Sequence, residues 1–94
     1  MGFRILFTED SLADLEAILN YFDNSDAAEQ FGTALLNHVE LLRSFPRMGE
    51  PVAKRPGVRK LLHTPIRVYD RLREGQELIE ILHFWHAART PPKI

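Results

Sequence analysis

Side chains able to bind an anion recur at every second position between residues 66 and 73. They are Arg67, Tyr69, Arg71 and Arg73. The positions between them are mostly apolar, and a period of two is typical of a strand with one apolar and one polar face. The pattern therefore predicts a strand whose cationic, aromatic face can meet a polyanion.

Charge is distributed unevenly along the chain, although the formal net charge is only −1. Residues 1–45 have a net charge of −6, and residues 46–94 have a net charge of +5. Seven cations and a single acid, Asp70, lie between Lys54 and Arg73. One part of the molecule is thus basic enough for a polyanionic partner. The alternative is a solvated strand face whose cations pair with acidic helices.

No metal or other cofactor is expected. The pair His83-x-x-His86 has a metal-like spacing on a helix, but residues three apart on a strand face opposite sides. The chain has no cysteine, which excludes disulfides and thiolate metal sites. His38 lies on the apolar stripe of a predicted helix, where packing is the expected role.

The first half of the chain predicts a strand and two helices that position this face. Residues 3–7 alternate as a short strand. Thr8 is the predicted N-cap of a helix over residues 9–22, whose apolar residues recur three and four apart. Asp26 and Glu29 match a capping pair for a second helix over residues 27–44. The short connection predicts an antiparallel helical hairpin.

The second half predicts a loop and three strands. Residues 46–57 contain three prolines and two glycines, which favours a loop. Strands are expected around Leu61 and Leu62, over residues 66–73 and over residues 77–86, with a tight turn at residues 74–76. The last strand is apolar at both parities, which indicates a central strand. Residues 89–94 form a tail in which two prolines oppose strand pairing.

These elements predict an α+β fold in one domain, residues 1–94, with the order β-α-α-β-β-β. The helical hairpin packs on one face of a small, mostly antiparallel sheet, and the cationic face is left open. No apolar run approaches the roughly 20 residues that cross a membrane. The N-terminus lacks the apolar core of a signal peptide, so a cytoplasmic protein is expected.

Several segments together resemble the RelE/ParE superfamily of bacterial toxins, often labelled plasmid stabilisation proteins. They are Ala13-Asp14-Leu15, Phe45-Pro46, a strand from Arg59 to Leu62, the pattern Arg67-Val68-x-x-Arg71 and the closing segment from Ile81 to Arg89. The resemblance covers about residues 3–90, and it rests on the order and spacing of these segments.

The resemblance implies the toxin of a type II toxin–antitoxin system, with one of two modes of growth inhibition. ParE-like members poison DNA gyrase, whereas RelE-like members are metal-independent endoribonucleases that cut mRNA in the translating ribosome. Both are neutralised by a small cognate antitoxin. The toxin would contact operator DNA only through that antitoxin, and no membrane partner is implied.

The resemblance also assigns candidate site residues. In a ribonuclease, Arg67, His86 and Arg89 would be catalytic, because cationic groups stabilise charge at the phosphate and histidine transfers protons near neutral pH. Residues expected to bind the target are Arg59, Tyr69, Arg71, Arg73 and Lys54, with Tyr69 able to stack on a base.

The acidic helices and the ending Trp85-His86-Ala87-Ala88-Arg89 favour the ParE-like reading, in which no catalytic residue is needed. RelE-like cleavage is the alternative. A third possibility is an inactivated member that only binds its antitoxin. It is suggested by Asp70, an acid that we expect within the basic face.

Overall fold

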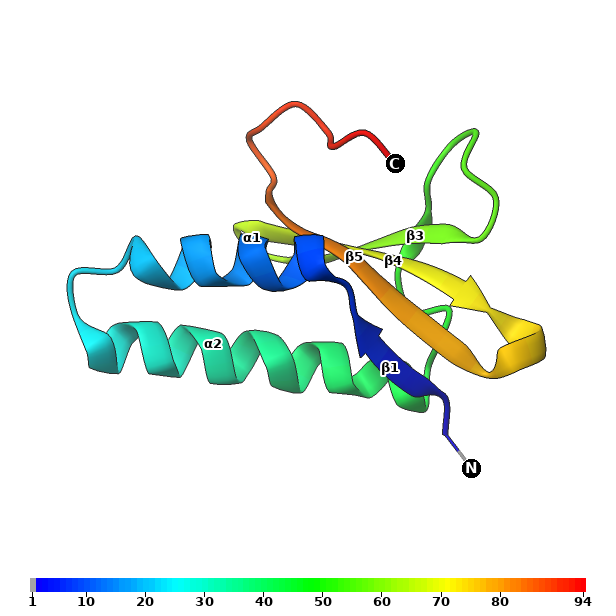
Figure 1. The fold of residues 1–94 in the computed structure, drawn as a ribbon, viewed down its shortest axis with the longest axis horizontal. Helices are drawn as coiled ribbons and strands as arrows, with labels where there is room; N and C mark the ends of the chain where they lie inside the picture. The colour runs from blue at the N-terminus through cyan, green and yellow to red at the C-terminus, as the bar shows by residue number, and fades with distance from the viewer. Residues whose placement is uncertain (1) are drawn as a thin grey trace.

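A five-stranded sheet with two helices packed against it makes up the fold (Figure 1). The computed structural model describes residues 2–94. The strand order is β1-β5-β4-β3-β2, in which β1 pairs with β5 in parallel and every other pair is antiparallel. Apart from the two-residue strand β2, the predicted order β-α-α-β-β-β is confirmed, as is the α+β class.

The first half forms β1 and the helical hairpin. The elements are β1 (Arg4–Phe7), α1 (Glu9–Asn20), α2 (Ser25–Glu40) and a 3₁₀ turn, η1 (Leu41–Arg43). Thr8 caps α1 as predicted, because its Oγ1 accepts a hydrogen bond from the Ser11 N–H. The same hydroxyl donates to the carbonyl oxygen of Ile81 at 2.7 Å, which ties the helix start to β5.

Three predicted helix boundaries are wrong. The first helix ends at Asn20, two residues early. The second begins at Ser25, and its N-cap is Asn24 instead of Asp26. The Asn24 Oδ1 accepts from the N–H groups of Asp26 and Ala27 at 2.7 and 3.2 Å, which satisfies two otherwise unpaired helix donors. The regular helix ends at Glu40, after which the chain tightens into η1.

The second half supplies the other four strands. They are β2 (Glu50–Pro51), β3 (Val58–His63), β4 (Ile66–Arg73) and β5 (Leu78–His86), with a 3₁₀ turn, η2 (Glu74–Gln76), between the last two. The bounds of β4 agree with the prediction. The segment 46–57 is not wholly irregular, because β2 lies within it and pairs with Arg59 and Lys60 of β3.

A bulge in β5 explains why that strand is apolar at both parities. Tyr69 pairs with His83, but Asp70 pairs with Ile81, so Leu82 has no partner on β4. The inward-facing positions therefore change parity from Ile81 to Phe84, both of which are buried. The strand is interior, as expected, but its apolar pattern comes from the bulge and not from burial of both faces.

The core lies between α2 and the sheet. Its fully buried members come from α2, η1 and strands β3 to β5: Leu35, Val39, Leu42, Leu61, Ile66, Val68, Ile79, Ile81 and Phe84. Fully burying one such side chain contributes roughly 1.5–3 kcal/mol. The stripe of the second helix therefore supplies the main apolar contact with the sheet, whereas Leu12 in the stripe of the first is 51% exposed.

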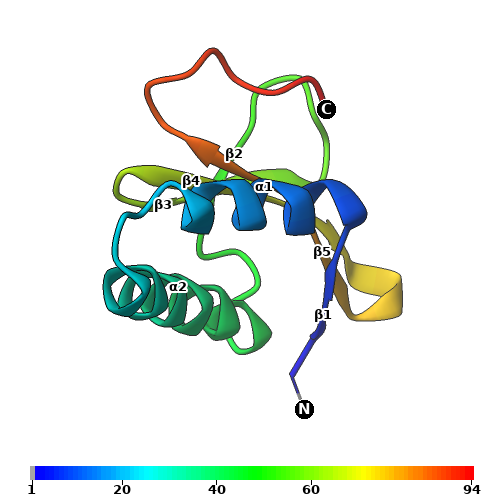
Figure 2. The same cartoon turned by 60° about the vertical axis from the view of Figure 1, so that its left-hand side comes forward.

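The opposite side of the sheet, bearing Arg67, Tyr69 and Arg71, is called the outer face below. It is not left open as predicted. Residues 87–94 arch over the sheet on the side away from α2 and approach the loop after β2 (Figures 1 and 2). The Trp85 Nε1 donates to the Thr90 carbonyl at 2.8 Å, and the Arg55 Nε donates to the Ile94 carbonyl at 2.9 Å. Prolines prevent this tail from pairing as a strand, but they do not prevent packing.

No helix in the described part of the chain is both long and apolar enough to cross a membrane.

Candidate functional site

The outer face carries two cations without an ionic partner. Arg67 and Arg71 lie four residues apart on the same face of β4, and both are partly exposed. Neither forms an ion pair with a described residue. Tyr69 lies between them but is only 3% exposed. Its ring is therefore not accessible as a stacking platform in this conformation.

Other cations near the outer face are neutralised within the molecule. The Arg73 Nε lies 2.5 Å from Glu80 Oε1, and the Lys60 Nζ lies 3.3 Å from Glu50 Oε1. Arg47 also pairs with Glu74. Because at least one partner of each pair is exposed to solvent, each pair stabilises the fold by at most about 1 kcal/mol, and a polyanion can compete for it. Among the cations on the strands of the outer face, Arg67 and Arg71 are therefore the two without an ion-pair partner in the described residues.

Arg59 lies on the other side of the sheet from this patch. It is the register partner of Asp70, and its Nη1 donates to the Gly49 carbonyl at 3.0 Å. Lys54 is exposed in the loop after β2, where it adopts a left-handed backbone conformation with φ of 63°. The structure therefore does not bring Arg59 and Lys54 into the patch formed by Arg67 and Arg71.

Asp70 is buried among the core residues and does not interrupt the basic face, which corrects the sequence-based expectation. Alternation along β4 places it beside Val68, and it is 0% exposed. Neither carboxylate oxygen has a hydrogen-bond partner among the described residues. Burial raises the pKa of Asp70 from 3.8 to about 7, and the charge of Arg59 opposes that rise.

The three ribonuclease candidates do not meet at one point. Arg67 is the register partner of Trp85, and the Arg89 guanidinium lies 3.8 Å from the centre of the Trp85 ring. His86 is the next residue along β5 and pairs with the buried Ile66, so its side chain faces the helices. The His86 Nδ1 accepts the Ala88 N–H at 3.1 Å.

An apolar groove of about 650 Å³ lies on the helix side. Its wall is formed by both helices, the turn after β3 and the end of β5. It is lined by Asp14, Ala17, Ile18, Tyr21, Phe22, Phe31, Pro65, Ile66, Phe84, His86 and Arg89. Tyr21 is 90% exposed at its rim. The sequence analysis did not anticipate a role for Tyr21, although the apolar helix stripe pointed to this side.

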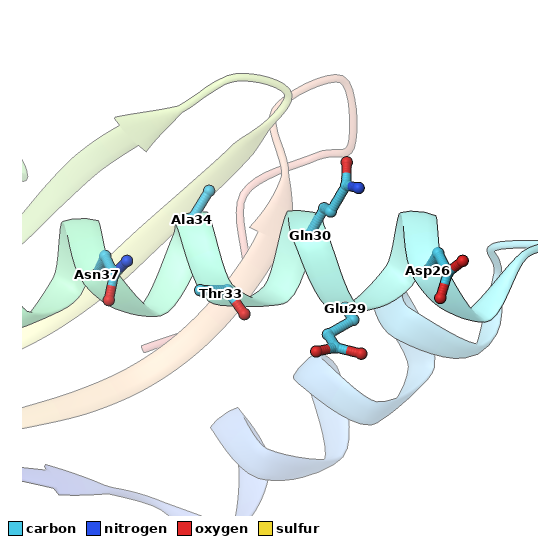
Figure 3. Close-up of a pocket in the computed structure, with 6 residues that line it drawn as sticks. All are labelled: Asp26, Glu29, Gln30, Thr33, Ala34 and Asn37. Atoms are coloured by element: carbon cyan, nitrogen blue, oxygen red, sulfur yellow. The ribbon is translucent and has the colours of Figure 1, made fainter.

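A second depression, on α2, is a weaker candidate (Figure 3). The side chains that line it all come from one helix and follow its outer surface: Asp26, Glu29, Gln30, Thr33, Ala34 and Asn37. No other element lines it. We interpret it as the solvated face of an amphipathic helix.

Asp14 makes a contact that the sequence did not predict. Its Oδ2 accepts the backbone N–H of Phe84 at 3.2 Å and lies 2.8 Å from the His83 Nδ1. Strand β1 pairs with β5 only as far as Ile81, so this carboxylate satisfies a donor on the edge that β1 leaves free. The arrangement fixes α1 along that edge and explains His83 without a metal. No cluster of three or more metal-ligating side chains occurs in residues 2–94.

Comparison with known proteins places this geometry in a family. Residues 5–91 match the model of a family described as the ParE toxin of type II toxin–antitoxin system, parDE. No match was found among curated protein sequences.

Solved structures share the fold. A chain of the chromosomal ParDE TA system from P. aeruginosa has a TM-score of 0.76 and 24% identity, over 90% of this chain and 96% of that one. A chain of the toxin–antitoxin complex RelBE2 from Mycobacterium tuberculosis gives 0.66 and 20%, over 92% and 99%. A mutant of E. coli toxin RelE in the free state gives 0.67 and 16%, over 94% and 86%. The chain belongs to the ParE toxin family of type II toxin–antitoxin systems.

Proposed function

We propose that this toxin inhibits growth by binding DNA gyrase, and that none of its side chains performs a chemical reaction. The observation that carries the proposal is the match of residues 5–91 to the ParE family, because the ParE-like branch is the one that acts on gyrase. A partner that neutralises it, the cognate antitoxin, follows from membership of a type II toxin–antitoxin family.

The separation of the ribonuclease candidates supports this proposal. Phosphate cleavage requires a proton-transfer group and cationic groups around one phosphate, held within hydrogen-bond reach. Arg67 lies on the outer face, whereas His86 faces the helices and lines the groove with Ile66. His86 therefore shares the groove with Arg89 but not with Arg67, and the three candidates cannot act together on one phosphate in this conformation.

The target-binding surface in this proposal is the patch of Arg67 and Arg71, with Arg73 beside it. Arg73 would have to exchange Glu80 for an acidic group of gyrase. We place the antitoxin elsewhere, in the apolar groove. Exposed rings such as Tyr21 and the partly exposed Phe22 at its wall are side chains that a protein partner would cover.

The experiment is a DNA supercoiling assay with purified gyrase and purified toxin. The toxin should inhibit supercoiling and trap cleaved DNA. The double variant Arg67→Ala/Arg71→Ala should lose at least about tenfold in potency, as expected for two charged contacts of roughly 1 kcal/mol each. The matched control is Arg4→Ala, an exposed arginine on β1. Full gyrase activity at saturating toxin would refute the proposal.

RelE-like cleavage is the second candidate, and one observation favours it. Arg67 and Arg89 both adjoin the Trp85 ring, a combination of cations and an aromatic that suits single-stranded RNA. It predicts cut mRNA in translating extracts and none in ribosome-free mixtures. Persistence of that cleavage in Arg67→Ala would remove this site assignment.

The third possibility was an inactivated member that only binds antitoxin. The observation that suggested it, an acid within the cationic face, is not found in the structure. Asp70 lies on the side of the sheet that faces the core, so it does not interrupt the cationic face. An Asp70→Tyr variant should therefore gain no toxicity in growth assays. Gained toxicity would restore that possibility.

A further inference from the structure

Two histidines join α2 to the sheet. His38 lies in the last turns of α2, and His63 is the last residue of β3. Their Nδ1 atoms are 2.9 Å apart, within hydrogen-bond distance, and both side chains are half-buried. Among residues 2–94 this is the one side-chain hydrogen bond between α2 and a strand. The rest of the attachment is apolar, through residues such as Leu35 and Val39.

The contact depends on the number of protons that the pair carries. A neutral imidazole has one N–H donor and one bare acceptor nitrogen. The hydrogen bond therefore requires a proton on one Nδ1 and a lone pair on the other. When both rings are fully protonated, two N–H groups and two positive charges face each other across 2.9 Å. The bond is then lost and replaced by repulsion.

Among residues 2–94, neither ring lies within ion-pair distance of an acidic side chain. His63 makes a T-shaped contact with the Phe31 ring of α2, with centroids 5.6 Å apart, and its register partner on β4 is Ile66. Phe22, which follows α1, packs against Phe31. Burial lowers the pKa of His63 below 6.5, and the charge of His38 lowers it further. His38 is the only charged group that contributes to this shift.

The pair also supports the wall of the apolar groove. Phe31 lines the groove and contacts His63 on one side and Phe22 on the other, with a ring separation of 5.4 Å to the latter. A shift of α2 away from β3 would move Phe31. The shape of the groove therefore depends on the protonation state of the His38–His63 contact, through Phe31.

We propose that His38 and His63 form a proton-operated latch between α2 and β3, closed when one Nδ1 carries a proton and the other does not, and open when both rings are cations. This goes beyond the proposed function, because it does not depend on the target of the toxin. A lowered folded-state pKa makes the unfolded state bind the proton first. The stabilisation is therefore complete above pH 6.5 and is lost as the pH falls below it.

Amide hydrogen exchange of the purified toxin tests the latch at pH 7.5 and pH 5.0, after correction for intrinsic exchange rates. In the wild type, protection of α2 relative to α1 should fall by roughly fivefold at pH 5.0, the effect of losing one hydrogen bond. In the double variant His38→Gln/His63→Gln the ratio should not change with pH. The matched control is His86→Gln, an exposed histidine that should behave like the wild type.

A wild-type ratio that does not change with pH would overturn the proposal, and so would a double variant that keeps the pH dependence. If the double variant fails to fold, an NMR titration of His63 in the single variant His38→Gln decides the matter. The pKa of His63 should rise towards 6.5 when His38 is removed. An unchanged His63 titration would refute the latch. Because no target is used, these results are independent of the gyrase assay.

Discussion

Asp70 should make the protein less stable as the pH rises through neutrality, and Asp70→Asn should remove that trend. The carboxyl group is 0% exposed and has no hydrogen-bond partner for either oxygen. Its pKa is about 7 in the folded protein against 3.8 in the absence of the fold. The folded state therefore holds a proton that the unfolded state releases. The stabilisation is complete below pH 3.8 and is lost as the pH passes 7.

The size of the effect follows from the two pKa values. The full shift corresponds to about 4 kcal/mol, at 1.36 kcal/mol for each pKa unit. Between pH 5 and pH 8 the proton linkage of this one group lowers the free energy of unfolding by roughly 2–3 kcal/mol. That is a large part of the 5–15 kcal/mol that stabilises a typical domain.

Urea denaturation of the wild type and of Asp70→Asn at pH 5 and pH 8 measures the contribution of Asp70 to the pH dependence of the free energy of unfolding. The difference between the two proteins cancels the titration of the histidines. Asp70→Asn should be close to the wild type at pH 5 and more stable at pH 8 by about 2–3 kcal/mol. Asp70→Leu should be more stable still at pH 8, because it removes the unpaired polar atoms. Parallel pH profiles for wild type and Asp70→Asn would refute this account of Asp70.

Three further substitutions test the packing, each by urea denaturation at pH 7. Thr8→Ala should cost about 1–2 kcal/mol, more than Asn24→Ala, because the Thr8 hydroxyl also bonds to β5; equal losses would show that the bond to β5 contributes nothing. Leu35→Ala should cost about 2–5 kcal/mol through the cavity left in the core; a loss under 1 kcal/mol would contradict its place there. Asp14→Ala should cost about 1–3 kcal/mol and unpair the Phe84 N–H, whose exchange should accelerate; an unchanged exchange rate at that amide would contradict the contact.

Local patterns predicted the elements well. The alternation of β4 predicted its bounds and its two faces, except at Asp70, which we expected within the basic face and which lies on the core side. The N-cap of α1 was equally clear, because Thr8 precedes two acids. The N-cap of α2 could not be assigned from the sequence, because Asn24 and Asp26 are both good caps. Only the folded backbone selects between them.

The contacts of the candidate site were harder to predict, because they join distant segments. Asp14 and His83 meet across 69 residues, and nothing near either residue signals the other. The bulge at Leu82 did leave a signal, since the apolar positions change parity between Ile81 and Phe84. The same pattern suits a strand buried on both faces, so the sequence alone could not distinguish the two.

The central claim is that the toxin acts on DNA gyrase and performs no RNA cleavage. Its most direct test is inducible expression in a bacterium, with pulse-labelled DNA and protein synthesis followed over the first minutes. Our account predicts early arrest of DNA synthesis with a DNA-damage response and filamentation, while translation continues. Early arrest of protein synthesis, with DNA synthesis still running, would contradict it and would return Arg67, His86 and Arg89 to consideration as a catalytic site.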